Sequence, residues 1–325
     1  MHTRTTKRGL ELTRLGLGAA QLGNLYRVTT DEEAAETVAS AWEGGIRYFD
    51  TAPHYGVGLS ERRLGEHLRA HPRDEFVVST KVGRLLVPSP ETAHERDPQG
   101  FDVPADPRRE WDFSRDGILR SVEESLTRTG LDRFDILYLH DPDDFFEQAS
   151  TEGIGALLEL REQGVVRAVG AGMNHAAPLA ELIRRADVDL VMCAGRYTLL
   201  DDRAAAELLP LALERGVGVV IAGVYNSGLL STPRPGPDAQ FDYQPAPPEI
   251  LDRAHRAADI CEAHGVTLPE VALAYVWRHP AVASVVVGAR GRSQVEQNLA
   301  RAQTPIPDAL WGALAETGII PKETA

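Results

Sequence analysis

Short hydrophobic runs alternate with amphipathic helical patterns along nearly the whole chain. Residues 76–80, Phe-Val-Val-Ser-Thr, contain β-branched and aromatic residues with no Gly or Pro, as expected of a buried strand. Ser/Thr-x-x-Glu capping boxes at Thr30, Thr267 and Ser293 predict the starts of three helices. Eight strands are predicted, each followed by a helix, at residues 15–18, 47–50, 76–80, 134–139, 165–170, 189–193, 218–222 and 283–287.

This alternation predicts the fold. Strands joined by helices pair in parallel, and eight such units favour a closed (β/α)₈ barrel, also called a TIM barrel. We expect residues 1–325 to form this α/β barrel as a single domain, and an open Rossmann-like sheet is the alternative. Segments 82–113 and 223–247 are rich in Pro and Gly and exceed ordinary loop lengths, so we expect long loops at the C-terminal face of the barrel.

Composition narrows the class of protein. The 325 residues are 43% hydrophobic and 25% charged, which is an ordinary globular balance. A formal net charge of −14 repels nucleic acid and anionic membranes, so neither is an expected partner. No apolar run approaches the ~18 residues of a membrane span, and two cysteines are too few for a disulfide framework. We therefore expect a cytoplasmic monomer or weak homo-oligomer.

Chemically active side chains stand at the ends of three consecutive predicted strands. Asp50 ends the second strand and Tyr55 follows it, Lys81 ends the third, and His140 ends the fourth. In a barrel these strand ends share one mouth, where active sites lie. An ammonium about 4 Å from a phenol, at an effective dielectric of ~20, favours the phenolate by about 3 pKa units. Lys81 is therefore expected to lower the pKa of Tyr55.

Such a set can move a proton on or off an oxygen atom. It offers no obvious covalent nucleophile, so the matching hydride must come from a cofactor. A barrel lyase that uses Lys81 as a Schiff base is an alternative.

Three stretches carry a family resemblance: GIRYFDTAPHYGVGLSERRLG, STKVG and DILYLHDPD. Together they look like the aldo-keto reductase superfamily, and the similarity extends over residues 12–300. The resemblance implies that Asp50, Tyr55, Lys81 and His140 form the catalytic tetrad. Tyr55 would donate the proton in reduction and accept it in oxidation.

Further motifs, LHDPD, AVGAGMNH, AGRYTLLD and VYNSGLL, resemble the group of D-threo-aldose 1-dehydrogenases, L-fucose dehydrogenases and L-galactose dehydrogenases, with pyridoxal 4-dehydrogenase nearby. The resemblance implies hydride transfer between a nicotinamide cofactor and a sugar or aldehyde. Two other functions stay open: an NADPH-dependent reductase of general aldehydes and ketones, and a non-catalytic cofactor-sensing subunit.

The resemblance also implies the cofactor site. In the family, the segment after the eighth strand grips the adenosine half, and NADP-preferring members often carry Lys and Arg where this chain has Gly288 and Gln294. We therefore expect NAD rather than NADP, although Arg290 and Arg292 stand close enough to compensate. The expected cofactor contacts are Met173 and Asn174 at the carboxamide, Ser227, Gly228 and Leu229 at the pyrophosphate, and Gly288, Ala289, Arg290, Gln294 and Asn298 at the adenosine.

Two glycine pairs, Gly16/Gly18 and Gly170/Gly172, imitate a Rossmann fingerprint but lack its third glycine, so we expect tight turns at strand ends. No metal site is expected, because Asp141, Asp143 and Asp144 have the pattern of solvated turn carboxylates. Substrate contacts are expected from side chains on predicted loops and strand ends: His54, Trp111, Arg196 and Tyr197.

Overall fold

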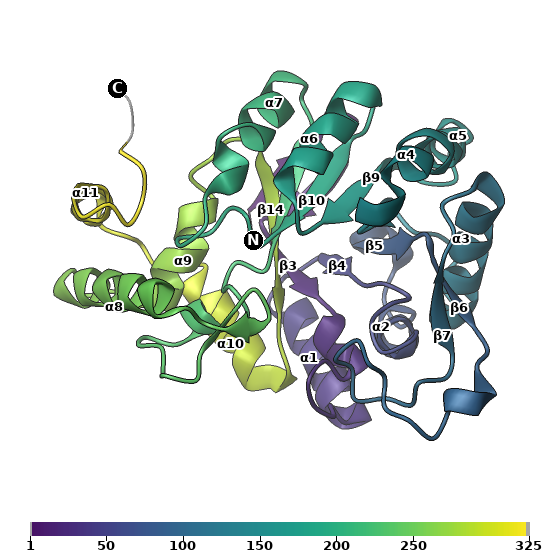
Figure 1. Ribbon diagram of the computed structural model, residues 1–325, viewed down its shortest axis with the longest axis horizontal. Coiled ribbons are helices and arrows are strands. Elements are labelled where there is room, and N and C mark those ends of the chain that lie inside the picture. The colour runs from purple at the N-terminus through teal and green to yellow at the C-terminus, as the bar shows by residue number, and fades with distance from the viewer. Residues whose placement is uncertain (1, 323–325) are drawn as a thin grey trace.

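Eight parallel strands close into a barrel in the computed structural model, which describes residues 2–322 (Figure 1). Each strand pairs with the next along the chain, and the last closes onto the first through Val285 opposite Leu15. This topology confirms the predicted (β/α)₈ barrel and excludes the open sheet. The barrel strands are β3 (Leu15–Gly18), β4 (Tyr48–Asp50), β5 (Val77–Val82), β8 (Ile136–His140), β9 (Ala168–Met173), β10 (Leu190–Ala194), β11 (Gly218–Ala222) and β14 (Val282–Gly288).

Helices surround the barrel and bury their apolar sides against it (Figure 1). Two predicted capping boxes are confirmed, because Thr30 and Glu33 satisfy each other's backbone amides before α1, and Thr267 and Glu270 do so before α9. The helices are α1 (Asp31–Glu43), α2 (Leu59–Leu68), α3 (Arg115–Thr129), α4 (Phe146–Gln148), α5 (Ile154–Glu162), α6 (Ala176–Arg185), α7 (Leu208–Glu214), α8 (Pro248–Ala263), α9 (Leu268–Val276), α10 (Gly291–Arg301) and α11 (Asp308–Glu316).

The third predicted capping box is wrong. Helix α10 already begins at Gly291, so Ser293 lies inside its first turn. Arg290 is the N-cap residue instead, and its backbone amide donates a hydrogen bond to Oε1 of Gln294 in the first turn at 2.8 Å. Helix α7 also begins six residues later than the predicted residue 202, after a short 3₁₀ turn at Arg203–Ala205.

The glycine pairs lie inside strands, so the prediction of tight turns there is wrong. A Cβ atom on Gly170 would stand 1.6 Å from the carbonyl oxygen of Leu190, and one on Gly16 would stand 2.9 Å from the Tyr48 ring. Both glycines thus make room for a neighbour. Because Gly170 and Gly172 continue the strand, β9 covers Ala168–Met173 rather than the predicted residues 165–170.

Two layers of apolar side chains form the core. A large layer lies between the barrel and its helices, and a smaller cluster fills the barrel interior, where Leu10 and Leu12 pack with Tyr48, Ile136 and Leu190. Leu10 and Leu12 belong to an N-terminal hairpin of β1 (Thr3–Thr5) and β2 (Glu11–Thr13) that closes the N-terminal end of the barrel.

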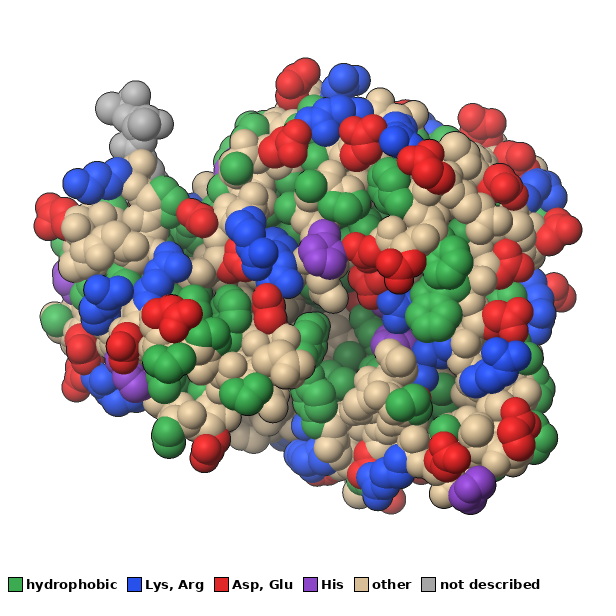
Figure 2. Space-filling model, viewed as in Figure 1, with side chains coloured by type: hydrophobic (Ala, Val, Ile, Leu, Met, Phe, Trp, Pro, Cys, Tyr) green, Lys and Arg blue, Asp and Glu red, His purple; other side chains and the backbone are tan. Residues whose placement is uncertain are grey.

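The two long segments at the C-terminal face are partly ordered into hairpins. The first contains β6 (Arg84–Val87) paired with β7 (Arg108–Trp111), and the second contains β12 (Gln240–Phe241) paired with β13 (Gln244–Pro245). Figure 2 shows a hollow near the middle of the molecule, with basic and histidine side chains along one side. Within residues 2–322, no helix is both long and apolar enough to cross a membrane.

Candidate functional site

Three neighbouring strands each direct two polar side chains into the barrel interior, near the C-terminal ends of the strands. Residues two apart on a strand point to the same side of a sheet. The pairs are Tyr48 with Asp50 on β4, Ser79 with Lys81 on β5, and Tyr138 with His140 on β8. All six side chains are buried. The second residue of each pair, Asp50, Lys81 or His140, is a predicted catalytic residue.

Lys81 is the centre of the site. Its Nζ donates to Oδ2 of Asp50 at 2.6 Å, to the hydroxyl of Tyr55 at 3.0 Å and to the Thr51 carbonyl at 3.1 Å. The other oxygen of Asp50 accepts from Ser79 at 2.7 Å. Asp50 is thus fixed by two donors, and it fixes Lys81 against the phenol of Tyr55.

A hydroxyl chain continues this network into the barrel. The hydroxyl of Tyr48 lies 3.1 Å from Oγ of Ser79 and 3.3 Å from the hydroxyl of Tyr138. Four side chains from three strands, namely Tyr138, Tyr48, Ser79 and Asp50, are therefore linked in sequence. Because buried networks with satisfied partners are rigid, this chain holds the carboxylate of Asp50 in one orientation.

Burial and charge set the protonation states. Burial raises the pKa of Tyr55 above its ordinary value, and the nearby positive charge of Lys81 only partly opposes that rise. The ammonium of Lys81 lowers the pKa of Tyr55, as expected, but the desolvation of this partly buried phenol outweighs it, so the net shift is upward. Burial disfavours the charge on Lys81, but Asp50 and Tyr55 more than offset it, and its pKa rises to about 12.

The raised pKa of Lys81 bears on the lyase alternative. A Schiff-base lysine needs a free amine, which is obtained by lowering the pKa. Lys81 is instead held as an ammonium by a carboxylate at 2.6 Å. The site therefore favours a lysine that acts through its charge.

His140 completes the group opposite Tyr55. Its ring stands edge-on to the Tyr55 ring, with centroids 5.9 Å apart. Burial, followed by the charges of Arg84 and Lys81, holds the pKa of His140 well below its usual range, so the imidazole is neutral. Its Nδ1 is buried without a hydrogen-bond partner, and Nε2 lies 3.6 Å from the Asp141 carboxylate. A neutral imidazole in this position can orient a substrate oxygen beside the phenol.

An arginine–aspartate pair borders His140. Arg84, at the start of β6, donates to Asp141 at 2.7 Å and lies over the Trp111 ring at 5.4 Å. This pairing replaces the predicted solvated turn for Asp141, which is held in a left-handed backbone conformation with φ of 40°. Asp143 contacts His175 instead, at 2.6 Å. In the part of the chain that the structure describes, no group of His, Cys, Asp and Glu side chains has the arrangement of a metal site.

The first long loop supplies an apolar wall beside Tyr55. Its buried residues Leu86, Phe101 and Val103 cluster with Val57, and Tyr55 packs against this group. Arg109 anchors the loop. Its two terminal nitrogens, Nη1 and Nη2, donate to Asp97 at 2.5 and 2.9 Å, and Nη2 also donates to the His54 carbonyl at 2.8 Å. The wall therefore has a fixed position relative to the phenol.

The predicted substrate residues separate into two sets. His54 lies at the site, with its ring 5.4 Å from His140 and 5.2 Å from Phe101, and its Nδ1 is buried without a partner. Trp111 is 37% exposed beside Arg84, on the rim. Tyr197 is different, because it packs with Tyr275 in the layer between the barrel and the helices. That position contradicts the predicted substrate contact of Tyr197.

Arg196 holds loops together. Its guanidinium donates to the Asn174 carbonyl at 2.7 Å and to Asp242 at 2.7 Å, and it lies 3.3 Å from Asp201. Asp242 and Tyr243 form the tip of the β12–β13 hairpin, and the Tyr243 amide donates to Ser227 at 3.0 Å. These protein partners occupy the guanidinium that was predicted to meet the substrate.

The tip of the hairpin reaches the mouth of the barrel. Tyr243 is 58% exposed. Partial desolvation raises the pKa of Tyr243 to about 12, and the charges of Tyr55, Tyr26 and Asp141 contribute to the rise, so these groups lie near one another. We refer to the contacts of Asp242 with Arg196 and of Tyr243 with Ser227 as the hairpin latch.

The segment after β14 has the geometry expected of a loop that enters a helix. Arg290 turns inward, where its Nε donates to Thr29 at 3.1 Å and its Nη2 donates to the Leu25 carbonyl. Arg292 pairs with Glu43 at 2.8 Å. The Gly291 amide donates to Thr37 at 2.6 Å, so part of the α10 N-terminus is already satisfied by protein groups.

The remaining predicted cofactor residues lie at the ends of other strands and on the loop after β11. Met173 is buried at the end of β9, and Asn174 follows it. Gly228 has φ of 96° and precedes the buried Leu229, and Ser227 is bound by the hairpin latch. Asn298 is buried on α10, where its Oδ1 accepts from the Tyr225 hydroxyl at 3.2 Å. Tyr225 thus points towards α10.

Some of the unsatisfied polar atoms of the structure lie at the C-terminal face, and they provide a test of whether a cofactor fits there. Buried polar groups in proteins nearly always have hydrogen-bond partners. Here the amide nitrogen and oxygen of Asn226 are both buried without one, as are Oε1 of Gln21 and the Nδ1 atoms of His54 and His140. Gln21 lies against Gly288, and Asn226 lies near Gly195 beyond the end of β10. A dinucleotide with its amide and phosphates fits this set of donors and acceptors.

Several of these residues were not predicted. Ser79, Tyr48 and Tyr138 could have been found, because each stands two residues before a predicted catalytic side chain on the same strand. No such two-residue spacing on a predicted strand marks Arg84 and Asn226. Their positions depend on how the long loops fold back over the barrel.

Comparisons with known proteins identify the family of this chain. The aldo/keto reductase family model matches residues 14–318. The chain is 49% identical over 320 residues to D-threo-aldose 1-dehydrogenase of Pseudomonas sp, with 96% of each chain covered. It is 40% identical over 330 residues to pyridoxal 4-dehydrogenase of Microbacterium luteolum, again with 96% of each covered. Among solved structures, an aldo-keto reductase from Bacillus halodurans in its holo form has a TM-score of 0.73 at 28% identity, with 95% of this chain and 93% of that chain covered.

These matches span nearly the whole chain and confirm the resemblance seen in the sequence. The non-catalytic alternative finds no support in the two relatives, because both are named as dehydrogenases. The chain belongs to the aldo/keto reductase family, and it is an oxidoreductase that uses a nicotinamide cofactor.

Proposed function

We propose that the protein is an NAD-dependent aldose 1-dehydrogenase, which oxidises the anomeric hydroxyl of a sugar to a lactone. The observation that carries the proposal is the Lys81 ammonium, which stands between Asp50 at 2.6 Å and the phenol of Tyr55 at 3.0 Å. The relative with 49% identity, a D-threo-aldose 1-dehydrogenase, supports the choice of substrate class.

In this proposal Tyr55 handles the proton. During oxidation its phenolate takes the proton of the sugar hydroxyl, and during reduction the phenol returns it. Lys81 stabilises the phenolate by its charge, and Asp50 keeps Lys81 ionised and in place. Neutral His140 holds the reacting oxygen by a hydrogen bond. When bound, the nicotinamide supplies the position that accepts or donates the hydride.

Polar and apolar groups around the tetrad support a sugar-sized substrate. His54 offers an unpartnered buried nitrogen, and the paired Arg84 and Asp141 present charge beside His140. Such groups can bind sugar hydroxyls, and sites of this kind discriminate against ligands that leave them unpaired. The apolar wall at Phe101 offers a surface for the C–H face of a sugar ring.

We propose that NAD is preferred over NADP. Gly288 and Gln294 are uncharged, and a Cβ at residue 288 would meet the Gln21 side chain at 2.3 Å. Arg290 is bound to Leu25 and Thr29, and Arg292 is bound to Glu43, so both predicted compensating charges have protein partners. The residues that would hold the dinucleotide are Met173, Asn174, Ser227, Gly228, Leu229, Gly288, Ala289, Arg290, Gln294 and Asn298, together with Gln21 and Asn226.

Pyridoxal is a second candidate substrate. The Phe101 ring lies 6.1 Å from the Tyr55 ring at an angle of 33°, so the two give the site an aromatic surface on which a flat aromatic aldehyde held as its hemiacetal can pack. The relative with 40% identity, a pyridoxal 4-dehydrogenase, supports this alternative.

Steady-state rates with NAD and with NADP test the proposal. The substrates are L-fucose, L-galactose, D-arabinose and pyridoxal, and the product is measured as reduced dinucleotide. We expect the highest kcat/KM with one of the sugars and NAD. Higher kcat/KM with pyridoxal selects the second candidate. Activity confined to NADPH and general aldehydes contradicts both, and tight dinucleotide binding without turnover would indicate a cofactor-sensing subunit.

We further propose that the chain works as a single domain in the cytoplasm, as a monomer or weak homo-oligomer. A sugar or aldehyde and a dinucleotide are the only partners that this function needs. Light scattering coupled to size-exclusion chromatography measures the mass in solution, and a stable tetramer would contradict this part of the proposal.

A further inference from the structure

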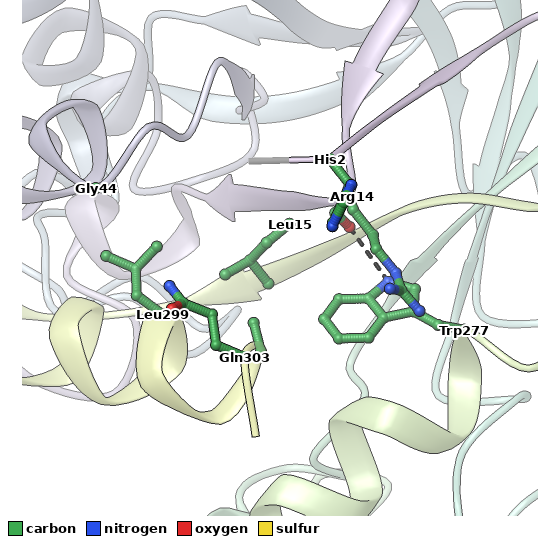
Figure 3. A pocket seen from close by; sticks show the side chains of 8 residues that line it. His2, Arg14, Leu15, Gly44, Trp277, Leu299 and Gln303 are labelled. Atoms are coloured by element: carbon green, nitrogen blue, oxygen red, sulfur yellow. Dashed lines mark hydrogen bonds between the residues drawn. The ribbon is translucent and has the colours of Figure 1, made fainter. Parts of the chain in front are cut away.

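A cavity lies where strand β3 begins, whereas the tetrad lies at the C-terminal ends of the strands. Figure 3 shows the residues that line it. Its volume is about 470 Å³, within the ~300–1,000 Å³ range of small-molecule sites. It opens where strand β3 begins, where α9 has ended, and where α10 ends. The lining residues are His2, Arg14, Leu15, Gly44, Trp277, Leu299, Ala302 and Gln303.

Arg14 is the chemically distinctive residue of this cavity. Its guanidinium carbon lies over the Trp277 ring, 4.2 Å from the ring centroid, and the Trp277 indole N–H donates to the Arg14 carbonyl at 3.3 Å (Figure 3). Nε of Arg14 is buried without a hydrogen-bond partner. Within residues 2–322, the Arg14 side chain has neither a carboxylate in salt-bridge range nor a hydrogen bond. Arg47, Arg253 and Arg290 also have no carboxylate partner, but they donate to carbonyl or hydroxyl oxygens.

Among residues 2–322, no carboxylate balances the positive charge of the Arg14 guanidinium. Burial, followed by the nearby positive charge of Arg4, lowers the pKa of Arg14 from its ordinary value. Arg4 itself donates to the Pro280 carbonyl at 2.7 Å and does not line the cavity. An anion beside Arg14 would therefore relieve an unfavourable charge and satisfy a buried donor in one step.

The rest of the wall is suited to the body of a small organic ligand. Leu15, Leu299 and Ala302 form an apolar side, and the Trp277 ring lies behind the guanidinium (Figure 3). His2 and Gln303 add polar groups at the exposed edge. A planar guanidinium already oriented by an aromatic ring binds carboxylate or phosphate oxygens in pairs with little loss of side-chain entropy.

We propose that this cavity is a binding site for a small organic anion, with its carboxylate or phosphate on Arg14 and its apolar part against Leu15 and Leu299. The ligand is distinct from the sugar and the dinucleotide, which belong to the opposite face of the barrel. The site does not depend on which substrate the tetrad oxidises.

The four tryptophan indole N–H signals in a ¹H–¹⁵N spectrum test the proposal on the whole protein. The Trp277 signal is assigned by its loss in Trp277→Phe. Phenylacetate and phenyl phosphate are the anionic probes, and phenylacetamide is the uncharged control. We expect at least one anion to move the Trp277 signal in a saturable way, at least tenfold more tightly than the amide, and the tighter anion identifies the head group.

Two variants of the cavity and one control variant outside it show where the anion binds. Arg14→Gln should weaken the anion at least tenfold, whereas Arg4→Gln, which removes an equal charge outside the cavity, should change it less than threefold. Ala302→Phe fills the cavity from α10, keeps Arg14, and should also abolish the shift. Unmoved Trp42 and Trp311 signals report intact folding. Equal binding of the anions and the amide, or unchanged anion binding in both Arg14→Gln and Ala302→Phe, overturns the proposal.

Discussion

The two ends of the barrel use buried carboxylates in different ways. At the N-terminal end, Asp189 accepts hydrogen bonds from Arg8 at 2.7 Å, Arg161 at 2.8 Å and the Val169 amide at 3.0 Å. At the C-terminal mouth, the carboxylate of Asp50 binds Ser79 and Lys81, and it holds Lys81 against the hydroxyl of Tyr55. The first carboxylate joins the N-terminal hairpin to the barrel, and the second positions a charge next to a phenol.

Buried polar atoms without hydrogen-bond partners are a second feature of the mouth. Near the mouth, His54, His140, Gln21 and Asn226 keep buried polar atoms without partners. Leaving such atoms unpaired costs about 1–3 kcal/mol each, so the mouth is less stable than it could be. The closed, N-terminal end has such atoms too, on Arg14, Arg73 and Asp135. We infer that the unpartnered atoms of the open end, the C-terminal mouth, are kept for its ligands.

Removing the charge of Lys81 should have the largest effect on this contrast. We expect Lys81→Met to lower kcat about 10²- to 10⁴-fold, because the phenolate of Tyr55 loses its stabilising ammonium. The pKa of Tyr55, already raised by burial, should rise further. Since oxidation needs the phenolate, the ascending limb of the kcat profile should move to higher pH. The pH dependence of the residual rate measures this shift.

Lys81→Met also leaves Asp50 buried without its ammonium, which destabilises the fold. The double variant Asp50→Asn/Lys81→Met removes both charges and serves as the control for folding. If it melts like the wild type and still turns over at the wild-type rate, then Lys81 has no part in the chemistry.

At the closed end, Asp189→Asn should reduce stability and leave the chemistry unchanged. The side chain is fully buried, and the neutral amide cannot satisfy Arg8, Arg161 and the Val169 amide together. We expect a loss of about 1–3 kcal/mol in the free energy of unfolding, measured by urea denaturation. Per folded molecule, kcat and KM should match the wild type. A tenfold fall in kcat would mean that the two ends are coupled.

The hairpin latch should have a smaller effect, and on binding. Asp242→Asn weakens the contact with Arg196 at 2.7 Å and loosens the hairpin that holds Ser227. We expect dinucleotide release to quicken about two- to tenfold in stopped-flow fluorescence, as for other loops that gate a site. Asp238→Asn, an exposed carboxylate of the same loop, is the matched control. Equal release rates in the two variants would exclude a latch function.

The smallest effect concerns the rim of the closed end. A hydrogen bond from Lys7 is the largest cause that lowers the pKa of Asp187 to about 2, from an ordinary 3.8. A lowered pKa in the folded state means that this contribution to stability is complete above pH 3.8 and is lost as the pH falls towards 2. Because Asp187 is 60% exposed, Asp187→Asn should cost less than about 1 kcal/mol at pH 7.

Urea denaturation at pH 7 and pH 3 measures that difference. We expect the gap between the wild type and Asp187→Asn to narrow at the lower pH. A gap that stays constant would show that the side chain contributes through packing rather than charge.

The contrast between the two ends explains what the sequence could predict. Asp50, Lys81 and His140 end strands that are short, apolar and regular, so barrel geometry brings them together at one mouth. Their inward partners follow from the two-residue period of a strand. The fold was predictable for the same reason, because each unit repeats one local pattern.

Other residues could not be placed from local pattern. Tyr197 and Arg196 follow a barrel strand, but packing with Tyr275 and pairing with Asp242 direct them away from the substrate. The pKa of Tyr55 depended on how deeply the folded loops bury it, and a pairwise estimate with Lys81 omitted that desolvation. Contacts between distant segments decide these features.

Turnover and dinucleotide affinity of Tyr55→Phe, measured on the same preparation, show whether Tyr55 carries the proton. The substitution removes one hydroxyl, the proton carrier 3.0 Å from Lys81, and keeps the ring that packs beside Phe101. We predict that kcat for sugar oxidation falls below about 1% of the wild type, while the Kd for NAD changes less than threefold. Wild-type turnover in Tyr55→Phe would contradict this prediction, as would loss of NAD binding together with activity.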